Sequence, residues 1–113
     1  MKTSELIGPA LDWAVANCEE LVSINTKNLF EPWYLLRDYT PSNDWAQGGP
    51  IIEREGIQIQ KHLSGWVALP EGAEFSEENY QEGETPLIAA MRCFVASKLG
   101  EEVEIPAELL EVA

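Results

Sequence analysis

The stretch that decides the fold spans residues 57–69 and reads IQIQKHLSGWVAL. Ile57 and Ile59 alternate with glutamines at a period of two, which is typical of a half-buried β-strand. A Ser-Gly turn follows, and the apolar run over residues 66–69 supplies a partner strand. The stretch therefore predicts an antiparallel hairpin.

Helical patterns lie on both sides of this hairpin. The first covers residues 8–20, with Pro9 near its start, where a missing N–H costs nothing. The second follows Thr85 as N-cap and Pro86 in the first turn, and it ends near Gly100. We expect these to be the two main helices.

The segments between the first helix and the hairpin carry weaker signals. Apolar runs near Leu21 and Trp33 predict two further strands. Residues 44–49 are polar and glycine-rich, which predicts an irregular loop. Pro50 is then expected to start a short helix that ends at Gly56.

The remaining segments are predominantly acidic. Residues 70–84 contain six glutamates and no apolar periodicity, which predicts a solvated loop. Val103 and Ile105 alternate with polar residues, as in a short edge strand, and residues 106–112 are expected to form one last helical turn.

The order of these elements, helix then strands then helix, predicts an α+β fold. A small antiparallel sheet is expected to pack against the two main helices. A chain of 113 residues, 45% of them hydrophobic, buries about two thirds of its surface around one core. Residues 1–113 are therefore expected to form a single domain.

The charge balance is strongly acidic. Twenty acidic residues against seven basic ones give a net charge of −13, which opposes contact with a phosphate backbone. We therefore expect no direct binding to nucleic acid. Residues 71–113 hold eleven acids and two bases, so the acidic excess flanks the helix that follows Thr85.

Cysteine and histidine are too few for a metal site of these ligands. Cys18 and Cys93 lie in the two helical patterns and are expected to be buried, reduced thiols. With the single His62 they make no zinc quartet, so no metal or other cofactor is expected. No secretory signal and no membrane-spanning run is apparent, which points to the cytosol and to no membrane partner.

Catalytic patterns are equally weak. No Gly-x-Ser-x-Gly elbow surrounds a serine, and the carboxylates are too numerous for any pair to stand out. The Gly-Gly pair at residues 48–49 is too short for a phosphate loop. We expect a binding protein rather than an enzyme.

The segment at residues 43–50, NDWAQGGP, is the most informative for function. An aromatic ring for stacking, polar groups for hydrogen bonds and glycines for close backbone approach suit a pocket for a flat polar ligand. The candidate ligand-binding residues of this segment are Asp44, Trp45, Gln47, Gly48 and Gly49. In the alternative interpretation, Trp45 fills the core and Asp44 caps a turn.

Two further residues complete the candidate site. Thr85 starts a helix whose N-terminal N–H groups are suited to an anion. Arg92, two turns later, is the candidate charge partner for that anion. The alternative for Arg92 is an ordinary surface arginine.

Several stretches, taken together, resemble those of a known family. They are ALDWAVA at residues 10–16, DWAQGGPIIE at 44–53, TPLIAAMR at 85–92 and VASKLG at 95–100. Together they resemble the NinX family of small tailed-phage and prophage proteins. The resemblance implies one NinX-like domain over residues 1–113 and an accessory protein made in the cytoplasm of an infected or lysogenic host. It implies no reaction.

Two hypotheses for function follow. The first is a non-enzymatic protein that binds and sequesters a small nucleotide-type ligand, in counter-defence, between the Trp45 loop and the Thr85 helix. The second is an acidic protein-binding inhibitor or DNA mimic that acts on a host or phage nucleic-acid enzyme. The partner is thus a small molecule or a host protein. The ligand, the host target and a homo-oligomeric state stay open.

Overall fold

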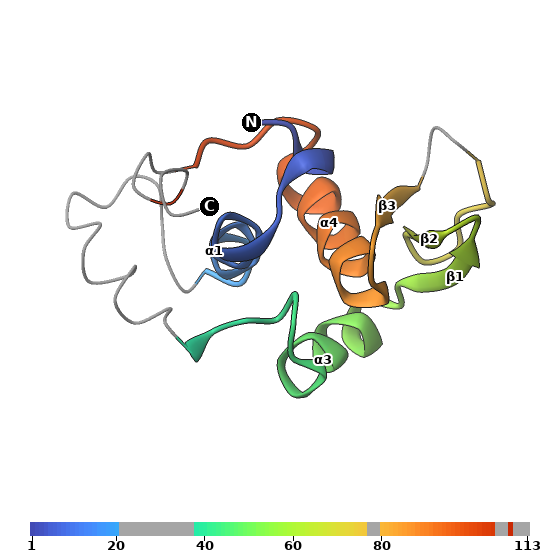
Figure 1. Ribbon diagram of the computed structural model, residues 1–113, viewed down its shortest axis with the longest axis horizontal. Coiled ribbons are helices and arrows are strands. Elements are labelled where there is room, and N and C mark those ends of the chain that lie inside the picture. The colour runs from blue at the N-terminus through green and yellow to red at the C-terminus, as the bar shows by residue number, and fades with distance from the viewer. Residues whose placement is uncertain (21–37, 77–79, 106–108, 110–113) are drawn as a thin grey trace.

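The computed structural model describes residues 1–20, 38–76, 80–105 and 109. A long helix, α4 (Pro86–Leu99), runs through the middle of the molecule, with α1 (Gly8–Cys18) on one side and a three-stranded sheet on the other (Figure 1). Helix α3 (Trp45–Glu55) packs against α4 from a third side. The predicted α+β class is confirmed.

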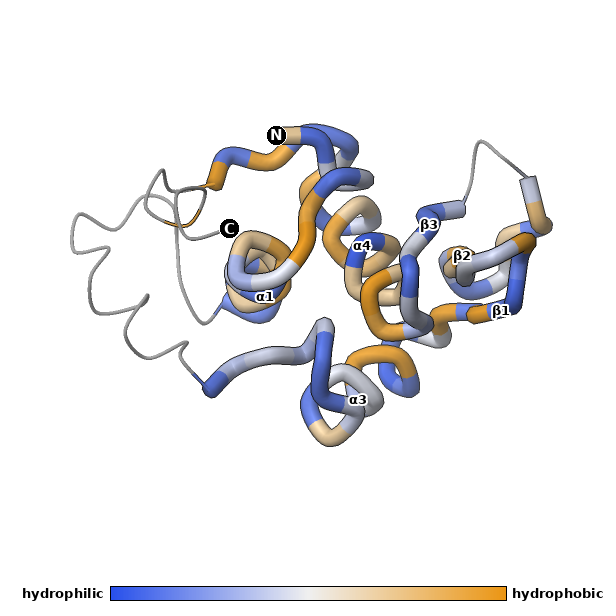
Figure 2. Tube along the Cα trace, in the orientation of Figure 1, coloured by the Kyte–Doolittle hydropathy of each residue, from blue (hydrophilic) through white to orange (hydrophobic). Residues whose placement is uncertain are grey.

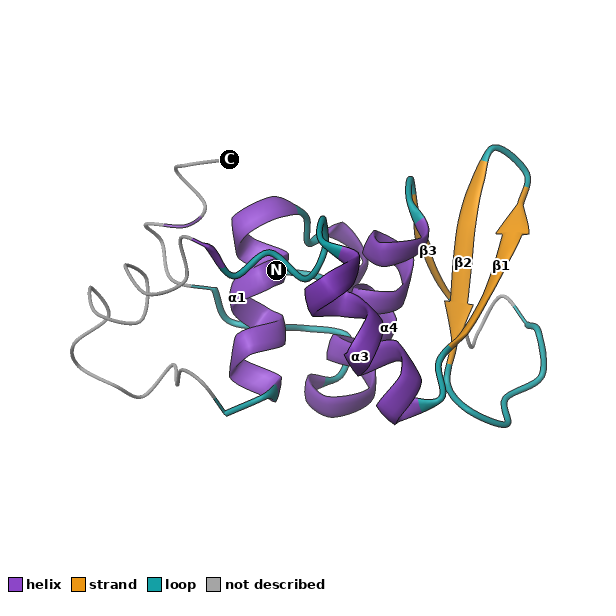
Figure 3. Ribbon diagram, turned by 90° about the horizontal axis from the view of Figure 1, so that it is seen from below, coloured by secondary structure: helices purple, strands orange, loops and turns teal. Residues whose placement is uncertain are grey.

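The sheet contains β1 (Gln58–His62), β2 (Gly65–Leu69) and β3 (Gln81–Gly83), in that order, and is antiparallel throughout. The predicted hairpin is confirmed, with Ile59 opposite Ala68. In Figure 3 the hairpin lies at one end of the molecule, beyond α4.

Strand β3 corrects the prediction that residues 70–84 are wholly loop. It joins the sheet through backbone pairing with β2, which apolar periodicity does not report. Gly83 allows it to approach α4 closely, because a Cβ there would lie 2.4 Å from the amide nitrogen of Ala89. Backbone therefore packs on backbone where the sheet meets α4.

Helix α4 forms as its sequence predicts. The Thr85 hydroxyl accepts a hydrogen bond from the Ile88 N–H at 3.1 Å and so caps the first turn. At the other end, the Gly100 N–H donates to the Ala96 carbonyl. The helix is apolar on most of its surface because α1, α3 and the sheet all cover it (Figure 2).

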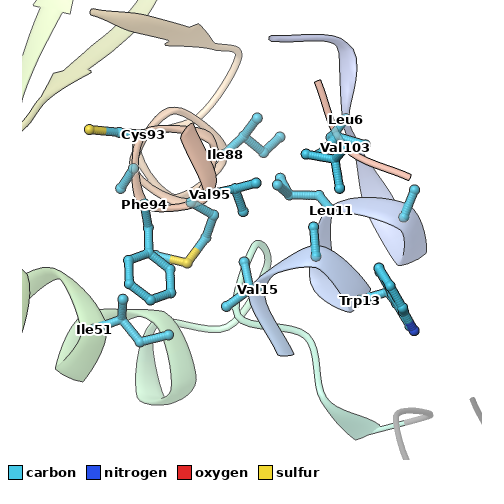
Figure 4. Packing of buried hydrophobic residues seen from close by; sticks show 14 of the residues in the cluster. Leu6, Leu11, Trp13, Val15, Ile51, Ile88, Cys93, Phe94, Val95 and Val103 are labelled. Atoms are coloured by element: carbon cyan, nitrogen blue, oxygen red, sulfur yellow. The ribbon is translucent and has the colours of Figure 1, made fainter. Parts of the chain in front are cut away.

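The hydrophobic core lies around α4. Figure 4 shows Phe94 pointing toward Ile51 of α3, while Val95 points toward Leu11 and Val15 of α1. These side chains are almost completely buried, and each contributes about 1.5–3 kcal/mol on leaving water. The core therefore joins the three helices into one unit.

Helix α3 overturns the prediction of a loop over residues 44–49. The helix begins at Trp45, with Asp44 as its N-cap: the Asp44 carboxylate accepts the Ala46 N–H at 2.9 Å. The sequence predicts that Pro50 starts the helix, but Pro50 lies inside α3, where the missing N–H removes one backbone hydrogen bond. Gly56 ends the helix as predicted, in the left-handed region at φ 68°.

The first residues of the chain pair with the segment after α4. Lys2 forms an isolated antiparallel bridge with Glu102, and the Val103 N–H donates to the Met1 carbonyl at 2.9 Å. The Thr3 hydroxyl also donates to the Gly100 carbonyl at 2.7 Å. The predicted edge strand at Val103 is thus an extended segment with one bridge.

Other predictions fall on residues that the structure does not describe. The strands expected near Leu21 and Trp33 lie outside the described residues. So does the last helical turn expected over residues 106–112, apart from Leu109, which is buried.

An ion-pair network joins the C-terminal ends of the helices. The Arg54 guanidinium binds Glu19 after α1 through two hydrogen bonds and binds Glu55 at 2.8 Å. Lys98 of α4 lies 3.6 Å from the same Glu55 carboxylate. The network is at the surface, where each pair contributes about 0.2–1 kcal/mol. Arg54 and Lys98 are therefore already paired with carboxylates of the protein itself.

Candidate functional site

The first turn of α3 holds most of the predicted site residues, and Gln47 connects it to the preceding chain. The Gln47 side-chain oxygen accepts the Thr40 N–H at 2.9 Å. Its amide nitrogen donates to the Asp38 carbonyl at 2.9 Å and to the Asp44 carboxylate at 3.0 Å. Both amide hydrogens are thus used within the protein. Gln47 fixes the start of the helix.

The two adjacent glycines of α3 differ in their surroundings. A Cβ at Gly48 would lie 2.4 Å from the Pro41 carbonyl oxygen and 2.7 Å from Leu87 of α4. At Gly49 the nearest atom would be in the Trp45 ring, at 4.0 Å. Gly48 therefore permits helix packing, whereas Gly49 leaves open space beside the Trp45 ring.

Trp45 lies on the surface. It is 55% exposed, whereas Trp13 of α1 is 2% exposed and belongs to the core. The alternative in which Trp45 fills the core is therefore wrong. The other part of that alternative, in which Asp44 is a capping residue, is right, because Asp44 is the N-cap of α3.

A buried hydrogen bond attaches the chain just before α3 to α1. Asp12 of α1 is 5% exposed and Ser42 is 1% exposed, and the Asp12 carboxylate accepts the Ser42 N–H at 2.9 Å. Burial raises the pKa of Asp12, and the interaction with Ser42 lowers it in part. The pair fixes the chain just before α3 against α1.

Thr85 and Arg92 occupy different environments. The exposed Thr85 caps α4. Arg92 is half-buried: its Nε donates to the Leu6 carbonyl and its Nη1 to the Glu82 carbonyl, each at 2.8 Å. Burial lowers the pKa of Arg92, and the nearby carboxylates of Glu84 and Glu82 offset this in part. Arg92 is therefore a fixed element of the structure, not an ordinary surface arginine.

Arg92 lies at the wall of a pocket between the β1–β2 turn, β3 and α4. The pocket has a volume of about 310 Å³, at the lower end of the range for small-molecule sites. Its lining includes His62, Ser64, Trp66, Glu82, Glu84 and Arg92.

Aromatic rings pack on both faces of the hairpin next to this pocket. The His62 ring lies 5.3 Å from that of Phe75 and 5.7 Å from that of Tyr80, measured between ring centres. The Lys61 ammonium lies 4.9 Å from the centre of the Trp66 ring. The His62 contacts attach the loop after β2 to the end of β1, and Lys61 packs over Trp66 on the other face of the hairpin.

The pocket has an uneven charge. Glu82 and Glu84 are exposed at its rim, whereas Arg92 is half-buried. A guanidinium carries five N–H hydrogens, and two of those of Arg92 bind carbonyl oxygens. Within the described parts of the chain, Arg92 forms no ion pair. Its remaining hydrogens suit an acceptor atom of a ligand.

The structure separates the predicted site residues into two groups. Residues 45–49 lie on α3 after the N-cap Asp44, and the close approach of Gly48 to Leu87 brings them to the first turn of α4, which Thr85 caps. Arg92 instead lines the pocket on the sheet side of α4. Sequence reasoning missed the other pocket residues because they come together only through strand pairing, as where Trp66 lies opposite Gly83.

A family comparison agrees with the resemblance seen in the sequence. Residues 2–98 match the family described as Bacteriophage P22, NinX. The chain belongs to this family. The match includes α1, α3, the sheet and nearly all of α4. It therefore covers more of the chain than the four short stretches that carry the resemblance. Membership supports a phage accessory protein. No curated protein matches the chain.

Two further properties concern the described residues. None of their helices has the length and apolar character needed to cross a membrane. Their His, Cys, Asp and Glu side chains form no cluster of three or more suited to a metal ion.

Proposed function

We propose that this phage accessory protein acts by binding rather than catalysis, and that it sequesters a small nucleotide-type ligand in the pocket lined by Arg92. Sequestration of a host signal would serve counter-defence in the host cytoplasm. The observation that carries the proposal is the half-buried guanidinium of Arg92, fixed by the Leu6 and Glu82 carbonyls at the pocket wall.

A fixed guanidinium is a good anchor for a phosphate or carbonyl group. Because two backbone carbonyls already hold Arg92, little side-chain entropy is lost when a ligand binds. A guanidinium half-removed from water also gains more from an anionic partner than an exposed one does. These properties support a ligand with an acceptor group at this end.

The other walls favour a flat ligand with little negative charge. Trp66 is among the lining residues, and its ring suits contact with the face of a nucleobase. Glu82 and Glu84 repel a ligand that carries many phosphates. The pocket therefore suits a nucleotide-type compound with one or two negative charges better than a triphosphate.

The experiment starts from the full chain purified from expressing cells. After heat denaturation and filtration, the filtrate is expected to contain a compound with nucleobase absorbance. Calorimetric titration with adenosine monophosphate and its cyclic form then measures binding directly. A filtrate without such a compound, together with no heat of binding for either nucleotide, would contradict the proposal.

A matched pair of variants assigns the binding to the pocket. Arg92→Lys keeps the charge but loses the fork of donors, and we expect it to weaken binding at least tenfold. Arg54→Lys makes the same change in the ion-pair network and should leave binding unchanged. His62→Ala provides a second pocket variant if Arg92→Lys lowers stability.

A second candidate function is supported by charge and by Trp45. The net charge of −13 suits a protein that occupies a basic site on a host or phage nucleic-acid enzyme, as a DNA mimic or inhibitor. An exposed tryptophan is the kind of residue that anchors protein interfaces. Binding of this kind falls steeply as salt is added, whereas a ligand in the Arg92 pocket is expected to be less salt-sensitive.

A further inference from the structure

We infer that the outer face of α3, centred on Trp45, docks a basic, arginine-bearing segment of another protein. This inference is independent of the Arg92 pocket. It rests on the second candidate function and makes it specific by naming the surface and the chemistry of its occupant.

The face is continuous and largely apolar. At the helical spacing of 3.6 residues per turn, Trp45, Ala46, Gly49, Pro50 and Glu53 lie within one side of α3. Trp45, Ala46, Pro50 and Glu53 are exposed, and Gly49 leaves space beside the Trp45 ring. The opposite side of the helix carries Gly48 and Ile51, which are buried.

The start of α3, which carries Trp45, is held in place by hydrogen bonds. Asp44 caps the helix at the preceding residue, and Gln47 binds the chain at Thr40 and Asp38. A tryptophan on a fixed helix start loses little conformational entropy on binding, which is a property of interface anchor residues. Trp45 is therefore prepared for contact before a partner arrives.

The negative charge around Trp45 favours a basic partner. Glu53 places an exposed carboxylate on this face, Asp44 adjoins the face as the N-cap, and Asp38 is exposed in the chain before α3. Arg54, the basic residue of α3, is occupied by Glu19 and Glu55. A planar guanidinium stacks on an indole ring and pairs with carboxylates, so arginine suits both features.

The same charge disfavours a second copy of the chain as the occupant. Each copy carries −13, and two such faces would bring like charges together. A basic partner removes this repulsion and gains from long-range attraction.

The probe is a short fluorescein-labelled peptide of alternating arginine and leucine, titrated with the full chain and followed by fluorescence anisotropy. Trp45→Ala leaves the net charge unchanged, and we expect it to weaken binding about tenfold or more at about 0.15 M salt. Glu53→Gln is expected to weaken binding about two- to fivefold. Glu101→Gln removes the same charge from the exposed segment after α4 and should bind like the wild type.

Three results would overturn the inference. Wild-type affinity of Trp45→Ala for the peptide would show that general acidity alone attracts it, which leaves the second candidate function standing without this surface. Equal losses in Glu53→Gln and Glu101→Gln would show the same. Sedimentation in which Trp45→Ala converts a dimer to a monomer would assign the face to a second copy. Melting curves of the variants confirm that each is folded.

Discussion

Asp12 of α1 accepts a hydrogen bond from the backbone N–H of Ser42 at 2.9 Å, and both residues are buried. This hydrogen bond joins α1 to the turn that leads into α3. Because α3 carries the exposed Trp45, the position of that residue depends on a carboxylate inside the protein. The pair therefore offers a direct test of how the surface of α3 is held.

The first prediction concerns pH. The pKa of Asp12 is raised above its ordinary 3.8 by burial, so the folded protein holds this proton more tightly than the unfolded chain. The stability that Asp12 contributes is therefore fully present below pH 3.8 and is lost as the pH rises through its folded-state pKa. Asp12→Asn has no proton to lose, so its stability relative to wild type is expected to increase with pH.

Urea unfolding between about pH 3 and about pH 8 measures this difference. Glu101→Gln controls for the general effect of removing one negative charge. A difference between Asp12→Asn and wild type that stays constant, or that falls as pH rises, would refute the assignment. Asp12→Ala removes the acceptor as well, which leaves the buried Ser42 N–H unpaired and is expected to cost about 1–3 kcal/mol.

The second prediction compares the adjacent glycines of α3. Gly48→Ala would place a methyl group against the Pro41 backbone and should destabilise the protein by about 1–3 kcal/mol. Gly49→Ala meets no atom closer than 4.0 Å and should stabilise it by about 0.5–1 kcal/mol through lower unfolded-chain entropy. Equilibrium unfolding measures the free energy of unfolding of both variants. Equal effects would show that the packing of α3 on α4 is assigned wrongly.

The third prediction compares two tryptophans. Trp45→Ala is expected to change the free energy of unfolding by no more than about 0.5 kcal/mol, because its ring is at the surface. Trp13→Ala removes a buried ring and should cost about 3–5 kcal/mol. Thermal melts distinguish them. A large loss in Trp45→Ala would mean that its ring packs against the protein after all.

The fourth prediction concerns the thiols. Burial, with a smaller effect of Glu19, raises the pKa of Cys18 to about 12, and burial raises that of Cys93 to about 11. Both thiols are free. Little thiolate exists at neutral pH, so iodoacetamide should react slowly with the native protein and quickly with the urea-unfolded chain. Mass spectrometry that finds rapid native alkylation, or a disulfide between the two residues, would contradict this.

The elements that could be predicted from sequence are those with local signals. Thr85 and Pro86 mark the start of α4, and the alternation of Ile57 and Ile59 marks the hairpin. Helix α3 could not be recognised by propensity, because Gly48, Gly49 and Pro50 all disfavour a helix. Tertiary packing and the cap stabilise it instead.

One signal for α3 is nevertheless present in the sequence. Asp44 and Gln47 have the spacing of a capping box, in which the side chain of the third helical residue binds the N-cap N–H. Here the Gln47 amide binds the Asp44 carboxylate, and its oxygen accepts the Thr40 N–H instead. The pocket offers no comparable signal. His62, Trp66 and Arg92 lie on separate elements, and only the pairing of β2 with β3 and the packing of β3 on α4 bring them together.

The pairing of residues 1–3 with residues 100–103 bears on how the protein forms during synthesis. Residues 1–3 are synthesised before α1, yet their partners are made only after the whole of α4. Contacts of such long sequence separation slow folding. During synthesis, the apolar α1 therefore exists without its partner α4 until residues 86–99 have been made, and this part of the fold is complete only when residues 100–103 pair with residues 1–3.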